Sequence, residues 1–104
     1  MKLKTWELRE NEKLLEEAAA SYITKRMIVM PKPNPGKLHI TDQRVVFTDA
    51  LTLFFDYPLD QVVSFSKGMG NLTLMTTDGK KHRLTGMFIK KLSRALEEAE
   101  VKNA

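Results

Sequence analysis

The sequence predicts a mainly β domain, built as an antiparallel barrel of about seven strands with one capping helix at its C-terminal end. Two observations lead to this class. Between Gly36 and Thr85, short apolar runs alternate with polar residues and are separated by turn residues, which is typical of half-buried antiparallel strands. From Met87 onwards the apolar period becomes helical. A single helix that follows a series of strands can cover an open end of the barrel.

The length of 104 residues indicates one domain over residues 1–104, with a polar N-terminal extension over 1–12 and the capping helix over 86–101. Cysteine is absent, which excludes disulfides, thiolate metal sites and a cysteine nucleophile. The N-terminus carries no apolar block of the kind that a signal peptide needs. No apolar run reaches the roughly 18 to 20 residues of a membrane span. We therefore expect a soluble, cytoplasmic protein.

Two patterns compete in the segment from Asn11 to Met30. Leucines and alanines at helical spacing, together with several glutamates, favour a helix in its first half. From Tyr22 onwards, β-branched and aromatic residues favour a strand. We expect a short helix or turn near Asn11 that leads into a strand from about Ala18, and the choice between helix and strand stays open from Asn11 to Tyr22.

Six further strands follow, each with apolar residues on one face. The expected spans are Lys37 to Thr41, Arg44 to Thr48, Leu51 to Tyr57, Gln61 to Ser66, Asn71 to Thr77 and Lys80 to Thr85. The expected buried residues are Leu38, Ile40, Phe47, Leu53, Phe55, Phe65, Leu74 and Leu84, and Leu51 and Val63 are expected to share these inward faces.

Two turn signals separate these strands. Three prolines within residues 31–36 predict a loop at a barrel end, because proline cannot donate a hydrogen bond to a sheet ladder. Asp78-Gly79 predicts a two-residue hairpin with a type I′ turn, which needs positive φ at both positions.

The C-terminal helix is expected to have one apolar stripe of Phe88, Leu92, Ala95 and Ala99, with Ile89 and Leu96 beside it. We expect Phe88 and Leu92 to pack over the barrel end.

Several stretches together resemble the bacterial PH-like domains of the GRAM type. The matching stretches are ENEKLL near the N-terminus, the strand at Ala20-Ser21-Tyr22, GKLHITDQRVVF at Gly36 to Phe47, YPLDQVVSFS at Tyr57 to Ser66 and LTLMTTDGKKHRLTG at Leu72 to Gly86. The resemblance implies a PH-like barrel of two orthogonal antiparallel sheets with a C-terminal helix. It also implies a binding module that is not an enzyme, in a family whose members often bind phosphoinositides or other proteins.

One departure from that family bears on the ligand. PH domains that bind phosphoinositides usually carry a Lys…Lys/Arg-x-Arg pattern across their first two strands. This region offers Lys25, Arg26, Lys32 and Lys37, and Lys37-Leu38-His39 has no arginine at the matching spacing. The pattern therefore argues against a specific inositide pocket.

Two groups of basic residues are candidate binding sites. Lys32, Lys37, Lys80 and Lys81 are expected to meet at the uncapped barrel end, as a rim for an anion or a lipid head group. Lys90, Lys91 and Arg94 form a second basic patch in the first half of the helix, where cations oppose the helix dipole. Either the sheet supplies compensating carboxylates, or this end of the helix meets an anionic partner. Ordinary solvated charges are the alternative for both groups, since the net charge of +4 is mild.

The chain carries no catalytic signature, and we expect no cofactor and no metal site. Neither His39 nor His82 has a carboxylate or a second histidine at ligand spacing. His39 is expected on the polar face of its strand, and His82 at the rim or in the core with a hydrogen-bond partner. Nucleic acid is not an expected partner, because aromatic residues are not interleaved with the basic ones. Trp6 lies outside the barrel pattern, either packed on the barrel or at a contact.

The resulting functional prediction is a non-enzymatic binding module. Its partner is expected to be another protein or an anionic membrane surface, which would make it cytoplasmic or peripheral to a membrane. The alternative is a self-assembling structural homo-oligomer with no lipid ligand.

Overall fold

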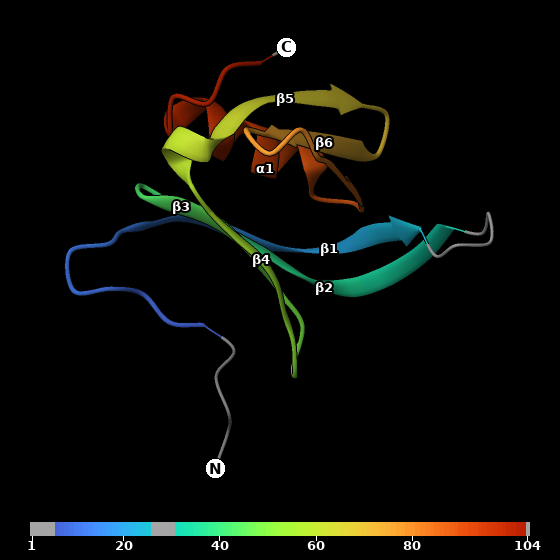
Figure 1. Cartoon of the computed structure of the whole chain (residues 1–104), viewed down its shortest axis with the longest axis horizontal. Coiled ribbons are helices and arrows are strands. Elements are labelled where there is room, and N and C mark those ends of the chain that lie inside the picture. Colours follow the sequence, from blue (N-terminus) through green and yellow to red (C-terminus); the bar gives the residue numbers. More distant parts are fainter. Residues whose placement is uncertain (1–5, 26–30, 104) are drawn as a thin grey trace.

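The computed structural model is a strongly bent antiparallel sheet with one helix packed against it (Figure 1). It describes residues 6–25 and 31–103. The strands are β1 (Leu14–Lys25), β2 (Pro31–Thr41), β3 (Arg44–Thr48), β4 (Leu53–Pro58), β5 (Val62–Gly68), β6 (Asn71–Thr76) and β7 (Lys81–Thr85). A short 3-10 helix, η1 (Leu59–Gln61), precedes β5, and the α-helix α1 (Ile89–Glu98) follows β7. The predicted order of strands and helix is confirmed.

The seven strands form one hydrogen-bonded sheet in the order β4-β3-β2-β1-β7-β6-β5, and all neighbours are antiparallel. β1 is the corner of this sheet. It pairs with β2 from Leu14 to Lys25, and it pairs with β7 through Ser21, Tyr22 and Ile23. The half formed by β5 to β7 therefore folds across the half formed by β1 to β4, and the core lies between them (Figure 1).

The first two strands extend further than the sequence predicts. A turn is present at Glu10-Asn11, as expected, but β1 begins at Leu14, four residues before Ala18, and the helical alternative is wrong. The loop expected over residues 31–36 is also wrong, because these residues belong to β2. The three prolines occupy alternate positions, so their imide nitrogens face the same edge of the strand. β3 pairs with β2 only from Lys37 to Ile40. The proline-containing part of β2 therefore has no β3 strand beside it that would need hydrogen bonds from those positions.

Two β-bulges explain why Leu53 and Val63 are exposed although the sequence predicts them on inward faces. The β3–β4 register skips from Phe47 opposite Phe55 to Thr48 opposite Leu53, so the side chain of Leu53 turns outward and is 45% exposed. Leu51 is 84% exposed in the preceding connection. The β5–β6 register skips Val63 in the same way, so Val63 is exposed while Val62 and Ser64 are buried.

The other seven predicted core residues are confirmed as buried: Leu38, Ile40, Phe47, Phe55, Phe65, Leu74 and Leu84. They share one core with α1. The hairpin between β6 and β7 is longer than predicted. The amide of Thr76 bonds to the carbonyl of Lys80, so three residues form the loop, and Gly79 has a positive φ of 82° while Asp78 does not.

α1 presents its inner face to the core through Ile89, Leu92, Ser93, Ala95 and Leu96. The helix begins after Phe88, which has φ −106° and ψ 19° and is therefore not helical. Its side chain does not follow the buried stripe and is 42% exposed, so the expected burial of Phe88 is wrong and that of Leu92 is confirmed. Within residues 6–25 and 31–103, no helix is long and apolar enough to cross a bilayer.

The chain after α1 returns to the edge of β5. Glu100 has a positive φ of 66°, and the amide of Val101 bonds to the carbonyl of Leu96 across this turn. Val101 is buried, and the carbonyl of Lys102 accepts a hydrogen bond of 2.9 Å from the amide of Phe65. One edge of the sheet is therefore covered by the chain itself, and β4 forms the other edge.

Candidate ligand-binding surfaces

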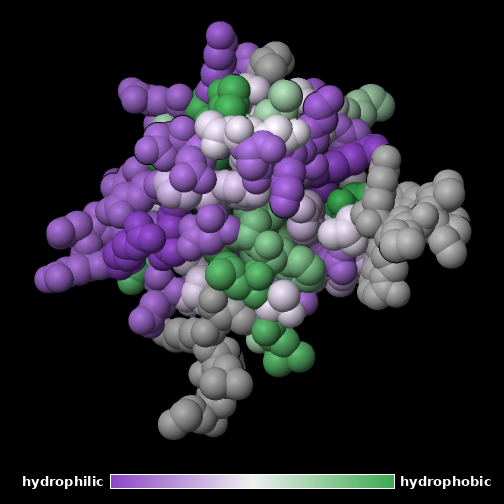
Figure 2. All heavy atoms as spheres, viewed as in Figure 1, coloured by the Kyte–Doolittle hydropathy of each residue, from purple (hydrophilic) through white to green (hydrophobic). Residues whose placement is uncertain are grey.

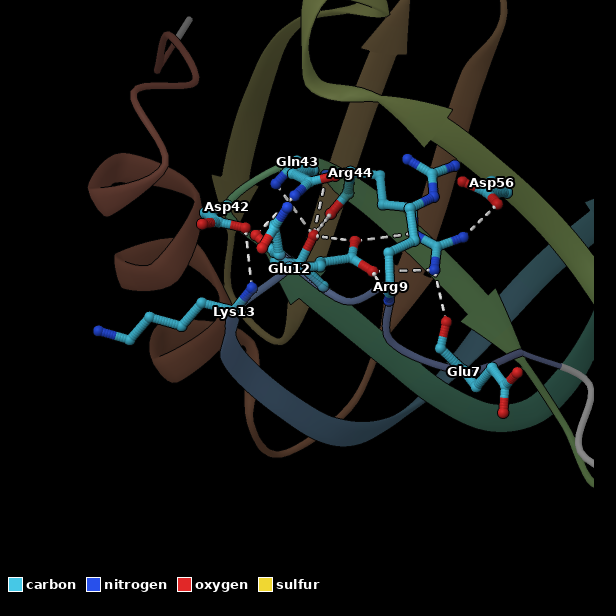
Figure 3. A network of polar contacts seen from close by, with 10 residues as sticks. Glu7, Arg9, Glu12, Lys13, Asp42, Gln43, Arg44 and Asp56 are labelled. Atoms are coloured by element: carbon cyan, nitrogen blue, oxygen red, sulfur yellow. Dashed lines mark hydrogen bonds and ion pairs between the residues drawn. The ribbon is translucent and has the colours of Figure 1, made fainter.

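A closed network of charged side chains joins the N-terminal segment to β3 and β4 (Figure 3). The guanidinium of Arg44 binds both carboxylate oxygens of Glu12, at 2.8 and 2.9 Å, and Oδ2 of Asp56 at 2.8 Å. It also donates to the carbonyl of Glu7 at 2.7 Å. Thr41 Oγ1 donates to Glu12 Oε2 at 2.6 Å. Four of the five N–H donors of the guanidinium are thus bonded within the chain.

The Glu12–Arg44 pair stays charged, and its polar groups are bonded within the chain. Glu12 and Arg44 are both buried. Hydrogen bonds from Arg44 lower the pKa of the Glu12 carboxyl from 4.5 to about 2, against the opposing effect of burial. A buried pair with complete hydrogen bonding holds the N-terminal segment on the sheet and leaves no site for an incoming anion. The sequence offered no local signal for this pair, whose members lie 32 residues apart.

Trp6 and His39 extend this closed region across the outer face of β2. The two rings have centroids 4.3 Å apart, and the Arg44 guanidinium lies 5.4 Å from the centroid of the indole ring. His39 is buried, with Nδ1 2.7 Å from Glu17 Oε2 and Nε2 2.8 Å from Thr48 Oγ1. Burial lowers its pKa, although the contact with Glu17 opposes this. His39 lies on the outer face of β2, as expected, and the ring of Trp6 packs against it.

His82 lies inside the barrel with partners on both ring nitrogens. Nδ1 is 2.8 Å from the Tyr22 hydroxyl, and Nε2 is 3.2 Å from Thr76 Oγ1. Burial lowers the pKa of His82. The prediction of a core histidine with a hydrogen-bond partner is confirmed. Because neither histidine has a ring nitrogen left for a substrate, the described part of the chain offers no poised general base of this type.

The four rim lysines of the sequence analysis lie on two parts of the sheet, the β6–β7 turn and β2, and a shared anion site between them stays a prediction. Lys80 and Lys81 are exposed at the β6–β7 turn. Lys32 pairs with Thr24 at the far end of β2, and its side chain lies outside the described residues. Lys37 is exposed five positions further along β2, about 17 Å from Lys32 for an extended strand. It borders a separate groove of about 510 Å3 with Pro35, Thr48 and Ala50.

The second basic patch borders a groove between α1 and the start of β1. The groove has a volume of about 400 Å3. Its apolar lining is Leu15, Met87, Phe88 and Ala95, its cations are Lys90, Lys91 and Arg94, and its acids are Glu16 and Glu98. The spacing of the helical residues explains this placement, because positions three, four and seven apart share one side of a helix. We call this feature the α1 groove.

The charges of the α1 groove are incompletely compensated. Lys91 Nζ lies 3.6 Å from Glu16 Oε2, so β1 does supply one of the carboxylates that the sequence analysis considered. Lys90 and Arg94 have no ion-pair partner among the residues described. The first turn of α1 contains no acid, and Phe88 at the N-cap provides no side-chain hydrogen bond. Cations near an uncapped helix start leave a positive potential at this end.

A third surface is apolar. Figure 2 shows hydrophobic side chains gathered over β4 and the connection that precedes it. The exposed members are Leu51 and Leu53, and Phe54 beside them is half-buried. This patch lies on the strand that ends the sheet order.

Comparison with known proteins identifies the fold. No family model matches the chain, and no curated protein does. Among solved structures, the C-terminal domain of an unknown protein from Leishmania infantum aligns with a TM-score of 0.64 and 20% identity, over 85% of this chain and 84% of that one. The Vps36 N-terminal PH domain aligns with a TM-score of 0.57 and 23% identity, over 88% and 83%.

A human PH domain gives the fullest overlap of these three. The PH domain of pleckstrin homology domain-containing protein family A member 5 aligns with a TM-score of 0.64 and 8% identity, over 100% of this chain and 91% of that one. At these identities the likeness concerns the backbone. The chain has the PH-like fold, as its sequence predicts.

Proposed function

We propose that the chain is a non-enzymatic, cytoplasmic binding module of the GRAM type of PH-like domain, and that it binds a protein partner at the α1 groove. The observation that carries the proposal is the groove itself, which combines an apolar lining with two cations, Lys90 and Arg94, that have no ion-pair partner among the described residues. Surfaces used for protein recognition commonly combine a desolvated apolar centre with a charged rim. The PH-like fold supports the choice of a binding module over an enzyme.

The distribution of polar groups supports the same choice. The Arg44 network is closed by internal contacts, and both histidines have their nitrogens occupied. Among residues 6–25 and 31–103 there is no group of three or more acidic, histidine or cysteine side chains placed to hold a metal ion. A catalytic site would need at least one side chain in a cavity that can act as a nucleophile, a general acid or a general base.

A second candidate is an anionic membrane surface. Lys80 and Lys81 favour it, because both are exposed on one turn and neither has an ion-pair partner in the described chain. A polybasic contact contributes about 1 kcal/mol per lysine near an acidic leaflet, so two lysines alone give weak binding. The third candidate is self-assembly, favoured by the exposed side chains of Leu53 on the edge strand β4 and of Leu51 just before it.

Light scattering on the purified chain, with and without vesicles that contain phosphatidylserine, separates these candidates. A protein-binding module is expected to have the 11.9 kDa mass of one chain and to ignore the vesicles at 0.15 M salt. A mass of two or more chains supports self-assembly and contradicts the proposal. Binding to the vesicles that Lys80→Glu with Lys81→Glu abolishes supports the membrane candidate.

Site-specific photo-crosslinking in cells then tests the surface. A photoreactive residue at Met87, beside the α1 groove, is expected to capture a protein that the same residue at Met69 does not. Met69 is a matched control, because the two methionines are 92% and 96% exposed. Equal capture at both positions would contradict a specific partner at the groove.

A further inference from the structure

The lining of the α1 groove defines the chemistry of the segment that fits it. We propose that the groove binds a short acidic segment of a partner protein, in which carboxylates at one end adjoin bulky apolar side chains. This inference rests on the function proposed above and specifies its ligand.

The apolar part of the segment has a place in the groove. Ala95 is buried and Leu15 is half-buried, so they form a floor, while Phe88 and Met87 stand at the exposed margin. A volume of about 400 Å3 lies in the range of small-molecule pockets, which leaves room for a large side chain in this open groove. A bilayer is a poor occupant, because a broad surface meets exposed tips and does not fill a groove between a helix and a strand.

The acidic part of the segment has its partners on α1. Lys90 and Arg94 are four positions apart and therefore project from neighbouring turns on one side of the helix. Their charges are not neutralised within the described chain. Lys91 is shared with Glu16, but that pair is 3.6 Å apart and its side chains are 54% and 26% exposed, so a ligand carboxylate can compete for it.

The groove also has a direction. The helical residues that line it run from Lys90 to Glu98, which corresponds to about 12 Å along the axis. An extended peptide covers that length with about four residues. The cations belong to the first half of this stretch, and Glu98 lies at the other end. The carboxylates of the ligand are therefore expected beside Lys90 and Arg94, and a neutral or basic residue beside Glu98.

A fluorescently labelled octapeptide provides the test. The probe contains three glutamates, then phenylalanine and leucine, then a lysine and two glycines, and its binding is followed by fluorescence anisotropy. One comparison peptide replaces the glutamates with glutamines, and a second replaces phenylalanine and leucine with serines. The protein is used as the whole chain, and 0.05 M and 0.3 M salt are compared.

Wild type is expected to bind the probe and to bind both comparison peptides at least about tenfold more weakly, since each removes one of the two contacts. The variant Lys90→Glu with Arg94→Glu is expected to weaken binding by roughly tenfold or more, because attraction becomes repulsion. The control Lys80→Glu with Lys81→Glu is expected to bind like wild type. Both variants alter exposed side chains, so the fold is retained.

Other results overturn the inference in distinguishable ways. If the probe binds and the Lys80→Glu, Lys81→Glu control loses it, the acidic ligand is right and the groove is wrong. If the probe fails to bind while crosslinking at Met87 still captures a protein, the ligand chemistry is wrong and the binding function stands. If neither the probe nor a cellular protein binds, and the vesicles do, both proposals fall together.

Discussion

The Arg44 network and the α1 groove contain the same kinds of charged residues in opposite conditions. Around Arg44, a buried guanidinium meets Glu12 and Asp56 at 2.8 Å, and each oxygen of the Glu12 carboxylate has further partners. Along α1, Lys90 and Arg94 are exposed and unneutralised in the described chain, and the Lys91–Glu16 contact is 3.6 Å long. Composition alone does not separate charges that hold a fold together from charges that await a partner, whereas burial and pairing do.

This difference predicts opposite costs of removal. Charges in the Arg44 network were desolvated on folding, so the loss of one partner leaves the other buried and unpaired. Charges of the α1 groove remain hydrated, so their loss changes little in the free chain. Stability measurements should therefore respond to the first cluster, and binding measurements to the second.

Arg44→Ala is expected to have the largest effect. It leaves the Glu12 carboxylate buried without its main partner, and it frees the N-terminal segment that holds Trp6 on the sheet. We expect a loss of about 3–5 kcal/mol in the free energy of unfolding, measured by urea titration. Lys90→Ala is the matched control and is expected to change stability by less than about 0.5 kcal/mol. Equal losses in the two variants would remove the distinction between the clusters.

The same distinction applies within α1, between its core side and its groove side. Leu92 is fully buried, and Leu92→Ala is expected to cost about 2–5 kcal/mol of unfolding free energy. Phe88 is 42% exposed, so Phe88→Ala is expected to cost less than Leu92→Ala, at about 1–2 kcal/mol. Thermal unfolding of the two variants provides the measurement. A larger loss of unfolding free energy for Phe88→Ala than for Leu92→Ala would indicate that the Phe88 ring is packed in the core, which contradicts an open groove beside it.

Acidification is expected to act through the Arg44 network. The folded-state pKa of Glu12, about 2, lies below its ordinary value of 4.5. The carboxylate therefore stabilises the fold above about pH 4.5, and this contribution of about 3 kcal/mol disappears as the pH falls toward 2. Urea titrations at several pH values should show this loss in wild type.

Glu12→Gln gives the control for that titration. The variant is expected to be less stable at pH 7 and to lose less stability between pH 4.5 and 2. Some dependence will remain, because the hydrogen bond from Thr76 lowers the pKa of Asp78 to about 2 as well. Parallel curves for Glu12→Gln and wild type would mean that this pair contributes nothing to acid unfolding.

The smallest expected effect on stability is that of reversing the groove charges. Lys90→Glu with Arg94→Glu places acids near the start of α1, where they interact favourably with the helix dipole. We expect the melting temperature to stay within about 2–4 °C of wild type, or to rise slightly. A fall of about 10 °C would indicate that these side chains support the fold.

The strand order and most of the core could be predicted because alternation is a local property. Phe47, Phe65 and Leu74 occupy inward positions that the period of two marks directly. The bulges at Phe54 and Val63 change the period by one residue and have no marker in composition, so the sequence predicts the wrong face for Leu53 and Val63. The prolines predict a loop because their common edge is visible only once the neighbours of β2 are known.

One wall of the candidate site could be predicted from the sequence, and the other could not. Lys90, Lys91 and Arg94 lie together in the sequence, which predicts a basic patch there. The other wall of the groove comes from Leu15 and Glu16, more than seventy positions earlier in the chain, and the fold brings it there. The Glu12–Arg44 pair is likewise non-local, so the sequence could not show which charges are consumed by folding.

Amide chemical-shift mapping by NMR tests the central claim most directly, namely that the α1 groove is the binding surface of this module. The 15N-labelled chain is titrated with the unlabelled acidic octapeptide at 0.05 M salt. We expect the shift changes to concentrate at Leu15, Glu16 and residues 87–98, with little change around Arg44 and at Lys80 and Lys81. Changes centred on the β6–β7 turn or on β4, with α1 unaffected, would contradict the account.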